Sequence, residues 1–278
     1  MTADTTVTDA GSAAGPHENE ELIRLERAES ILLVRLNRPA KRNSLNRAMI
    51  DSLIDVFTAL ATGADGTDTL DAVVLAGAPG AFCAGADIAG YHNAAATDLA
   101  EFTHRALTLV NLVRSAPVPV IASVDGMALG GGLELALAAD FIVASTRATL
   151  GLPETRIGLI PGWGGTASLT EAIGVRRAKE LIFSGAPLNA EQAEQWGLVN
   201  RVTPTGEADA AALALASHIS AQAPLAVRAA KRSVHAASTA TIGTTTETQE
   251  LLTLFATADG IEGVAAFVDK RPPLFRGL

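Results

Sequence analysis

Two glutamates stand in segments that otherwise hold glycine and apolar residues. Glu134 comes just after three consecutive glycines at 130–132, and Glu154 lies in the glycine-rich stretch 151–166. Two carboxylates in one water-poor site can serve as acid and base, because burial raises a carboxyl pKa toward neutrality. A glutamate on an apolar stretch is more often exposed or ion-paired. The pair is therefore a catalytic candidate on condition that the fold brings the two side chains together.

Two glycine-rich segments could offer free backbone N–H groups to a ligand. In 124–138 a strand-like run ends in three glycines and an amphipathic run begins, which would expose the first N–H groups of a helix. Close packing at a tight turn explains the same glycines equally well. In 77–88, small residues flank Ala84. Two N–H groups from two such loops would form an oxyanion hole, which stabilises negative charge developing on a carbonyl oxygen.

The elements that would position these residues alternate between strands and helices. Apolar runs next to glycine, proline or aspartate predict strands at 31–36, 71–77, 118–124 and 141–145. Apolar residues at helical spacing predict helices over 50–60 and 98–114. This alternation is typical of an α/β architecture.

The composition and periodicity of the sequence change near both ends. Residues 1–20 have no periodicity and predict a disordered tail, and 21–200 form the predicted α/β core. The segment 201–278 is alanine-rich and predicts a helical appendage, with helices at 206–222, 224–238, 244–258 and 261–270. Four such helices cannot all bury their apolar faces alone, so we expect the appendage to dock on the core or on another subunit.

Composition excludes several classes of protein. The chain has 278 residues and a net charge of −9, which argues against a nucleic-acid binder. One cysteine excludes an internal disulfide, and the five histidines show no metal-ligand spacing, so we expect no metal. No apolar run reaches the ~18 residues of a membrane helix. Because 1–20 hold no Lys or Arg, neither a secretory signal nor a mitochondrial presequence is expected, and the predicted location is the cytoplasm.

Taken together, the three glycine-rich segments resemble the enoyl-CoA hydratase/isomerase (crotonase) superfamily. The opening segment 36–46, Leu-Asn-Arg-Pro-Ala-Lys-Arg-Asn-Ser-Leu-Asn, and the closing segment 262–272, Glu-Gly-Val-Ala-Ala-Phe-Val-Asp-Lys-Arg-Pro, extend the resemblance over nearly all of the chain except the tail. The resemblance implies a spiral of ββα units with a C-terminal helical region that forms a homo-trimer or a dimer of trimers. It also implies an acyl-CoA substrate, and no cofactor beyond the coenzyme A that carries the acyl group.

The resemblance assigns a role to each candidate. The N–H groups of Ala84 and Gly131 would hold the thioester oxygen, Glu134 would deprotonate a water that attacks C3, and Glu154 would protonate C2. These roles are those of an enoyl-CoA hydratase. The residues that the resemblance places on coenzyme A are Lys41, Ala84, Ala86, Asp87 and Ile88, with Phe267 and Lys270 reaching a neighbouring subunit's coenzyme A. The alternative for each lysine is an ordinary solvated charge.

Some features depart from the hydratase pattern. Ala167-Ser168-Leu169 stands where hydratases commonly carry Gln-Arg-Leu, and Trp163 stands where small residues are common. The segment 89–98 corresponds to the variable acyl pocket, with Tyr91 and His92 as candidate wall residues. The acyl chain length therefore stays open. So does the reaction: the alternatives are a Δ3-Δ2 isomerase, a pathway-specific dehydratase or lyase, and a non-catalytic acyl-CoA binder. A serine hydrolase is disfavoured because no G-x-S-x-G elbow is present.

Overall fold

The computed structural model describes residues 21–88, 95–239, 253 and 257–278. The predicted tail 1–20, the candidates Tyr91 and His92, and most of the predicted helix 244–258 lie outside the described residues.

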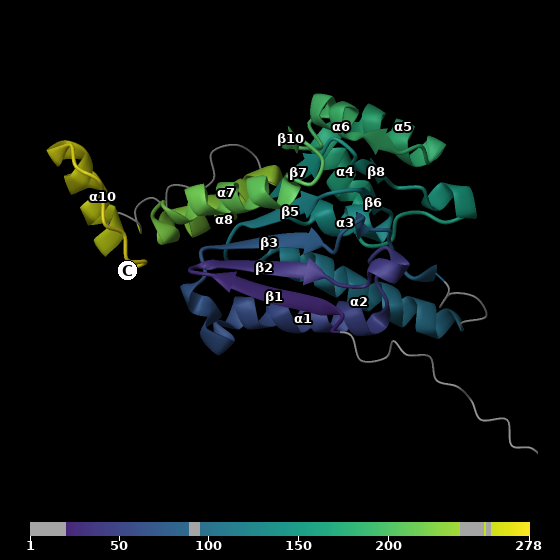
Figure 1. Cartoon of the computed structure of the whole chain (residues 1–278), viewed down its shortest axis with the longest axis horizontal. Coiled ribbons are helices and arrows are strands. Elements are labelled where there is room, and N and C mark those ends of the chain that lie inside the picture. Colours follow the sequence, from purple (N-terminus) through teal and green to yellow (C-terminus); the bar gives the residue numbers. More distant parts are fainter. Residues whose placement is uncertain (1–20, 89–94, 240–252, 254–256) are drawn as a thin grey trace, which may run out of the picture.

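The main sheet holds all four of the predicted strands. Its spatial order is β1 (Ile23–Ala28), β2 (Ile31–Leu36), β3 (Ala72–Gly77), β5 (Val120–Val124), β7 (Phe141–Ser145) and β10 (Arg201–Thr203) (Figure 1). Only the β1–β2 pair is antiparallel, and the other neighbours run parallel. The central strands are buried on both faces, which explains why their sequences are continuous apolar runs rather than alternating ones.

A second, smaller sheet carries the loops of the candidate site. Its order is β4 (Ala81–Cys83), β6 (Met127–Leu129), β8 (Thr149–Gly151) and β9 (Leu188–Asn189). Strand pairs β3–β4 and β5–β6 lead into α2 (Ala96–Arg114) and α3 (Gly131–Leu137), and β7–β8 lead through a short 3-10 helix into α4 (Gly165–Ile173). Each repeat thus adds one strand to each sheet before its helix. The predicted spiral of ββα units is confirmed.

Helices cover the first face of the main sheet. The predicted helix 50–60 is α1 (Arg47–Thr62), which begins where the Asn46 side chain accepts the Met49 N–H at 2.9 Å. Its apolar stripe lies in the main hydrophobic core. The remaining helices of the core region are α5 (Val175–Ser184) and α6 (Ala190–Trp196).

The second face is covered by α7 (Ala208–Ser220), and this corrects the domain boundary predicted at residue 200. Ala212 and Ala216 of α7 pack on Val74 and Ile121 in a second core cluster. Asp209 of α7 forms a 2.8 Å ion pair with Arg35 of β2. The core therefore continues through α7 and includes β10. Sequence analysis missed β10 because three residues are too few to show a strand pattern. It left open whether the C-terminal helices dock on the core or on another subunit, and α7 docks on the core.

The end of the chain leaves the two sheets. Helix α8 (Pro224–Thr239) leaves α7 at a bend of 109°. Helix α10 (Ala258–Asp269) stands apart from the sheets (Figure 1). The Asp259 carboxylate accepts the N–H groups of Arg276 and Gly277 at 2.7 and 2.8 Å, so α10 packs on the last residues of its own chain. Ile261 and Val264 of α10 stay exposed.

Within the described ranges, no single helix has the length and hydropathy of a membrane span. The pair Ala208–Ser220 and Pro224–Ala236 passes the length and composition test only when taken together, across a bend of 109°.

Candidate active site

The carboxylate of Glu134 is fixed in one orientation inside the protein. The side chain, on the first turn of α3, is 3% exposed. Its Oε1 accepts the N–H groups of Trp163 and Gly165 at 2.7 and 2.8 Å. Only glycine fits at position 165, because a Cβ there would lie 2.7 Å from the Glu134 Cγ. The loop before α4 thus serves as a clamp on one oxygen of Glu134.

Glu154 reaches the same place from the end of β8. It is the first residue of the 3-10 helix Glu154–Ile157, and its Oε1 lies 2.9 Å from where a Cβ of Gly130 would be. Gly130 directly precedes α3, so Glu154 lies over the start of the helix that carries Glu134. Its Oε2 is buried and has no hydrogen-bond partner among the residues that the structure describes. The two carboxylates therefore converge.

Burial changes the acidity of both glutamates. It raises the pKa of Glu134 to about 7, an effect that the charge of Glu154 reinforces and the two N–H groups oppose. Burial also raises the pKa of Glu154. In the described part of the chain, the groups that shift these two pKa values include no cation. The pair therefore has the properties of acid–base groups rather than of a structural ion pair.

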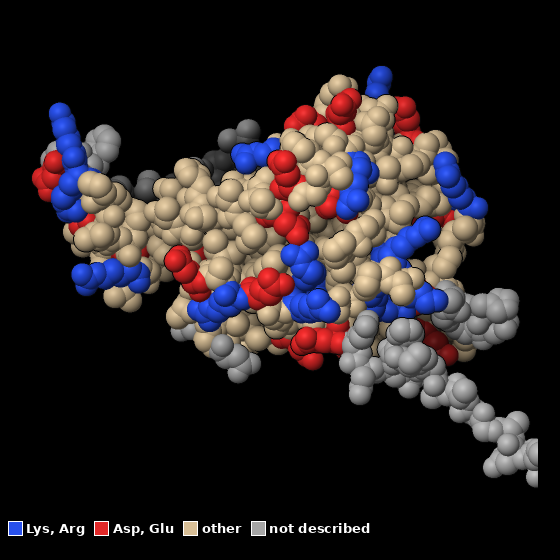
Figure 2. Space-filling view, viewed as in Figure 1, with Lys and Arg blue, Asp and Glu red and all other residues tan. Residues whose placement is uncertain are grey.

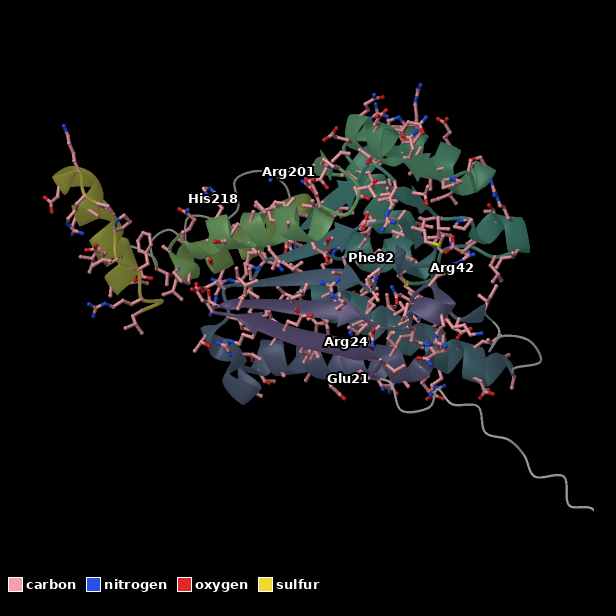
Figure 3. The ribbon with its side chains drawn as sticks, in the orientation of Figure 1. Glu21, Arg24, Arg42, Phe82, Arg201 and His218 are labelled. Carbon is pink, nitrogen blue, oxygen red and sulfur yellow. The ribbon has the colours of Figure 1, made fainter. Side chains whose placement is uncertain are left out.

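The loop after β4 packs against the start of α3. The chain turns at Gly85, whose φ is 105°, and a Cβ there would lie 3.5 Å from the backbone nitrogen of Gly131. Phe82 lies beside α3, and Arg42 lies farther toward the edge of the molecule (Figure 3). This contact brings the two loops predicted to hold a carbonyl oxygen side by side.

The donor on this loop is not Ala84, and the prediction for its N–H is wrong. That N–H donates to the carbonyl oxygen of Arg42 at 3.0 Å. Beyond the turn, Leu45 bridges the chain through the Gly85 carbonyl and the Asp87 N–H, at 2.8 and 2.9 Å. The N–H of Ala86 faces away from this bridge and has no partner in the described ranges 21–88, 95–239, 253 and 257–278. Ala86 is thus the residue whose N–H is available beside Gly131; spacing could not show which side of the turn each N–H faces.

Comparison with known proteins agrees with this geometry. The model of the enoyl-CoA hydratase/isomerase family matches residues 26–277. The chain belongs to the enoyl-CoA hydratase/isomerase family. It is similar to the mouse mitochondrial enoyl-CoA hydratase domain-containing protein 2 (40% identity over 255 residues, 90% of this chain and 85% of the relative). It is also similar to human mitochondrial methylglutaconyl-CoA hydratase (37% identity over 258 residues, 91% and 75%). A solved enoyl-CoA hydratase from Bacillus anthracis superposes with a TM-score of 0.89 at 36% identity, over 93% of this chain and all of that one.

In this family member, three of the residues predicted on coenzyme A lie on one edge of the site. Lys41 is exposed at the end of the 3-10 helix Pro39–Lys41, and Ile88 is exposed beyond Ala86. Asp87 is half-buried and forms a 3.0 Å ion pair with Arg38. Sequence analysis missed Arg38, which ties the two loops together. Figure 2 shows basic side chains gathered on the side of the molecule where β2 ends.

The two C-terminal candidates do not join the site of their own chain. Lys270 is exposed just after α10, which stands apart from the sheets and from α3 (Figure 1). The side chain of Phe267 lies outside the described part of the structure. Their contact with a neighbouring subunit's coenzyme A stays a prediction.

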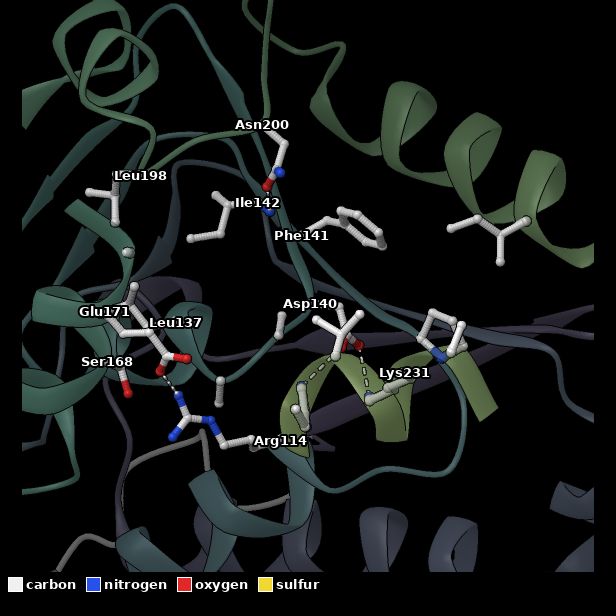
Figure 4. Close-up of a pocket in the computed structure, with 18 of the residues that line it drawn as sticks. Arg114, Leu137, Asp140, Phe141, Ile142, Ser168, Glu171, Leu198, Asn200 and Lys231 are labelled. Atoms are coloured by element: carbon white, nitrogen blue, oxygen red, sulfur yellow. Dashed lines mark hydrogen bonds and ion pairs between the residues drawn. The ribbon is translucent and has the colours of Figure 1, made fainter. Parts of the chain in front are cut away.

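A cavity of about 860 Å³ lies away from the two glutamates, between α4, α8 and the start of β7. Asp140 and Lys231 point toward each other at one side of it, and Arg114 and Glu171 at another (Figure 4). The Asp140–Lys231 distance is 2.7 Å, and both side chains are largely buried. Leu137, Ile142 and Leu198 are among its apolar lining residues. The paired charges distinguish this cavity from the glutamate site.

Proposed function

We propose that this family member is an enoyl-CoA hydratase, which adds water across the 2,3 double bond of a trans-2-enoyl-CoA to give a 3-hydroxyacyl-CoA. The observation that carries the proposal is the convergence of buried Glu134 and half-buried Glu154 at the start of α3, beside the N–H groups of Ala86 and Gly131. Hydration needs an acid, a base and a group that stabilises an oxyanion, and this arrangement offers all three.

The backbone donors act on the thioester. Its carbonyl oxygen would accept the N–H groups of Ala86 and Gly131, which are stronger partners for that oxygen once it gains negative charge. Drawing electrons onto the oxygen makes C3 electrophilic. Each donor belongs to a segment held by backbone bonds, so little reorganisation accompanies the reaction.

The carboxylates move the protons. Ionised Glu134 takes a proton from water as the water oxygen bonds to C3, and the π electrons of the double bond move into the enolate. Protonated Glu154 then gives its proton to C2, and the carbonyl re-forms. The net change is the addition of one water, and a proton passing between the two carboxyl groups resets the pair. Burial raises the pKa of Glu154, which is the direction that suits a group that gives up a proton.

The other residues predicted on coenzyme A bind that part of the substrate in this proposal. Lys41 would contact its phosphates, and Ala86, Asp87 and Ile88 its adenine, with Arg38 holding Asp87 in place. Phe267 and Lys270 would come from a neighbouring subunit. No cofactor beyond the coenzyme A of the substrate, and no metal, takes part.

The proposed assembly is a homo-trimer or a dimer of trimers. Its support is the position of α10 apart from the sheets, with Ile261 and Val264 exposed on α10 and Val234 exposed on α8. Light scattering during size-exclusion chromatography tests it, and a monomer would contradict it. The cytoplasmic location stays a prediction, since the two relatives named above carry "mitochondrial" in their names.

The deciding experiment is a hydration assay that follows the ultraviolet absorbance of enoyl-CoAs of several chain lengths. Turnover by the wild type, lost in both Glu134→Gln and Glu154→Gln, supports the proposal. Full activity of Glu154→Gln would overturn it. An isomerase could shuttle one proton with one carboxylate, so 3-enoyl-CoA isomerisation that survives one of the two changes would favour that alternative. Binding of acyl-CoA without any turnover would favour a non-catalytic binder.

The corrected donor can be tested with proline, which has no N–H. Ala86→Pro removes the proposed donor, and we expect kcat to fall by about 10²–10³-fold. Ala84→Pro removes instead the bond to Arg42, so it should lower stability more than turnover by the folded protein. Melting temperatures of both variants separate the two effects. A larger loss of kcat in folded Ala84→Pro than in folded Ala86→Pro would return the role to Ala84.

A further inference from the structure

The ring of Trp163 lies against the residue that would bind the thioester oxygen. Its atoms Cζ3, Cη2 and Cε3 are 2.1, 2.5 and 2.6 Å from the position that a Cβ of Gly131 would take. The six-membered part of the indole therefore covers the Gly131 α-carbon, and only glycine fits beneath it. The backbone N–H of the same tryptophan holds Glu134 Oε1 at 2.7 Å. Trp163 thus touches both the carbonyl-binding residue and the group that would activate water.

The ring is held firmly in this position. It is 5% exposed and belongs to the main hydrophobic core. Behind it lies Phe102 of α2, with ring centroids 5.9 Å apart and planes tilted by 57°. The preceding Gly162 faces the Thr103 methyl group, 3.7 Å from where its Cβ would be. The indole cannot turn toward α2 without displacing the ring of Phe102.

The path of an acyl chain follows from the positions of the reacting atoms. With C1 at the Gly131 N–H, C2 and C3 lie beside the two carboxylates, so C4 continues from between them. The indole occupies the space bounded by Gly131 and Glu134. We infer that Trp163 is a specificity-determining residue whose ring closes the acyl pocket shortly beyond C4 and restricts the substrate to short acyl groups. This inference rests on the proposed function of Gly131 and Glu134.

The kinetic test compares kcat/KM for four-, eight- and twelve-carbon trans-2-enoyl-CoAs. The wild type should prefer the four-carbon substrate. Trp163→Ala and the larger Trp163→Leu should raise the ratio of eight-carbon to four-carbon kcat/KM by about tenfold or more, because added methylenes gain a place to be buried. Both variants keep the backbone N–H that donates to Glu134, and the readout is the ratio between the two substrates rather than the absolute turnover.

Trp196 supplies the matched control. It is the only other tryptophan in the chain and ends α6, where the Arg177 guanidinium lies 5.5 Å from its ring. Trp196→Leu removes a partly buried indole of the same size outside the glutamate site, so the chain-length ratio should stay that of the wild type. Thermal melting of each variant identifies any that fails to fold. If Trp163→Ala fails, Trp163→Leu still serves for the test, because it leaves a smaller cavity.

A binding measurement keeps this test independent of turnover. Calorimetry with butanoyl-CoA and octanoyl-CoA measures affinity without any reaction. The ratio of the affinity for octanoyl-CoA to that for butanoyl-CoA should be about tenfold higher in Trp163→Leu than in wild type. An unchanged chain-length ratio in folded Trp163 variants, in both kinetics and binding, would overturn the inference. Absence of hydration by the wild type, with the shift in binding preserved, would instead reject the hydratase proposal and keep Trp163 as a wall of the acyl pocket.

Discussion

Acidic side chains are removed from solvent in two regions of the fold, and the two regions differ in whether a cation lies beside them. At the start of α3, Glu134 lies close to Glu154. Backbone N–H groups hold Glu134, and Oε2 of Glu154 has no hydrogen-bond partner among the residues that the structure describes. Beside α8, Asp140 faces the ammonium group of Lys231 at 2.7 Å and also accepts the Val120 N–H at 2.8 Å. Glu134 is buried and Glu154 half-buried, and the side chains of Lys231 and Asp140 are 8% and 14% exposed. The difference is whether burial is compensated by an opposite charge.

The consequence of this difference appears in the pKa values. Uncompensated burial raises the pKa of Glu134 to about 7 and also raises that of Glu154. At the other site burial lowers the pKa of Lys231, while the attraction to Asp140 opposes that shift. A carboxyl group that is costly to ionise can give and take protons near neutral pH, whereas a carboxylate paired with a cation holds elements together. The Asp140–Lys231 pair joins α8 to the beginnings of β5 and β7, so we interpret it as structural.

The largest effect is expected where the uncompensated pair is broken. Glu154→Gln keeps the shape of the side chain but removes the proton that it would give to C2, so kcat/KM should fall by about 10²–10⁴-fold. The free energy of unfolding should be equal or higher, because the amide has the shape of the carboxyl group and cannot ionise in the site. Steady-state hydration kinetics and urea unfolding measure the two quantities. A variant that loses stability and keeps activity would place Glu154 with the structural carboxylates.

The opposite outcome is expected at the second region. Lys231→Met removes the ammonium group and leaves Asp140 buried, with His235 3.6 Å away as a weaker partner. The free energy of unfolding should fall by about 3–5 kcal/mol, the usual cost of breaking a buried pair. Turnover per folded molecule should stay at the wild-type value, because neither residue approaches the glutamates. Lys231→Arg is the control, since it keeps the charge; a loss of turnover in folded Lys231→Met would contradict the separation of the two regions.

Sequence reveals one side of this comparison better than the other. Glu134 and Glu154 are conspicuous because their neighbours are glycine and apolar residues, and the long strands and helices around them follow from regular apolar patterns. The convergence of the two glutamates depends on β6 and β8, which have three residues each and show no pattern of their own. The choice between Ala84 and Ala86 depends on a single turn at Gly85. Asp140 and Lys231, 91 positions apart, look like ordinary surface charges until the fold pairs them.

The smallest expected effect is a difference between the two regions in how the free energy of unfolding depends on pH. The pKa of Glu134 in the folded protein is about 7, above its ordinary value of 4.5, so the folded state holds this proton more tightly than the unfolded chain does. Its contribution to stability is complete below pH 4.5 and is lost as pH rises through 7. Glu134→Gln cannot lose a proton, so its stability relative to wild type should rise by about 3 kcal/mol across that range. Urea unfolding at a series of pH values measures the difference.

Because Lys231→Met leaves Glu134 intact, its stability difference from wild type should vary much less over the same range. A difference between Glu134→Gln and wild type that stays constant with pH would show that Glu134 is compensated after all and remove the contrast between the two regions.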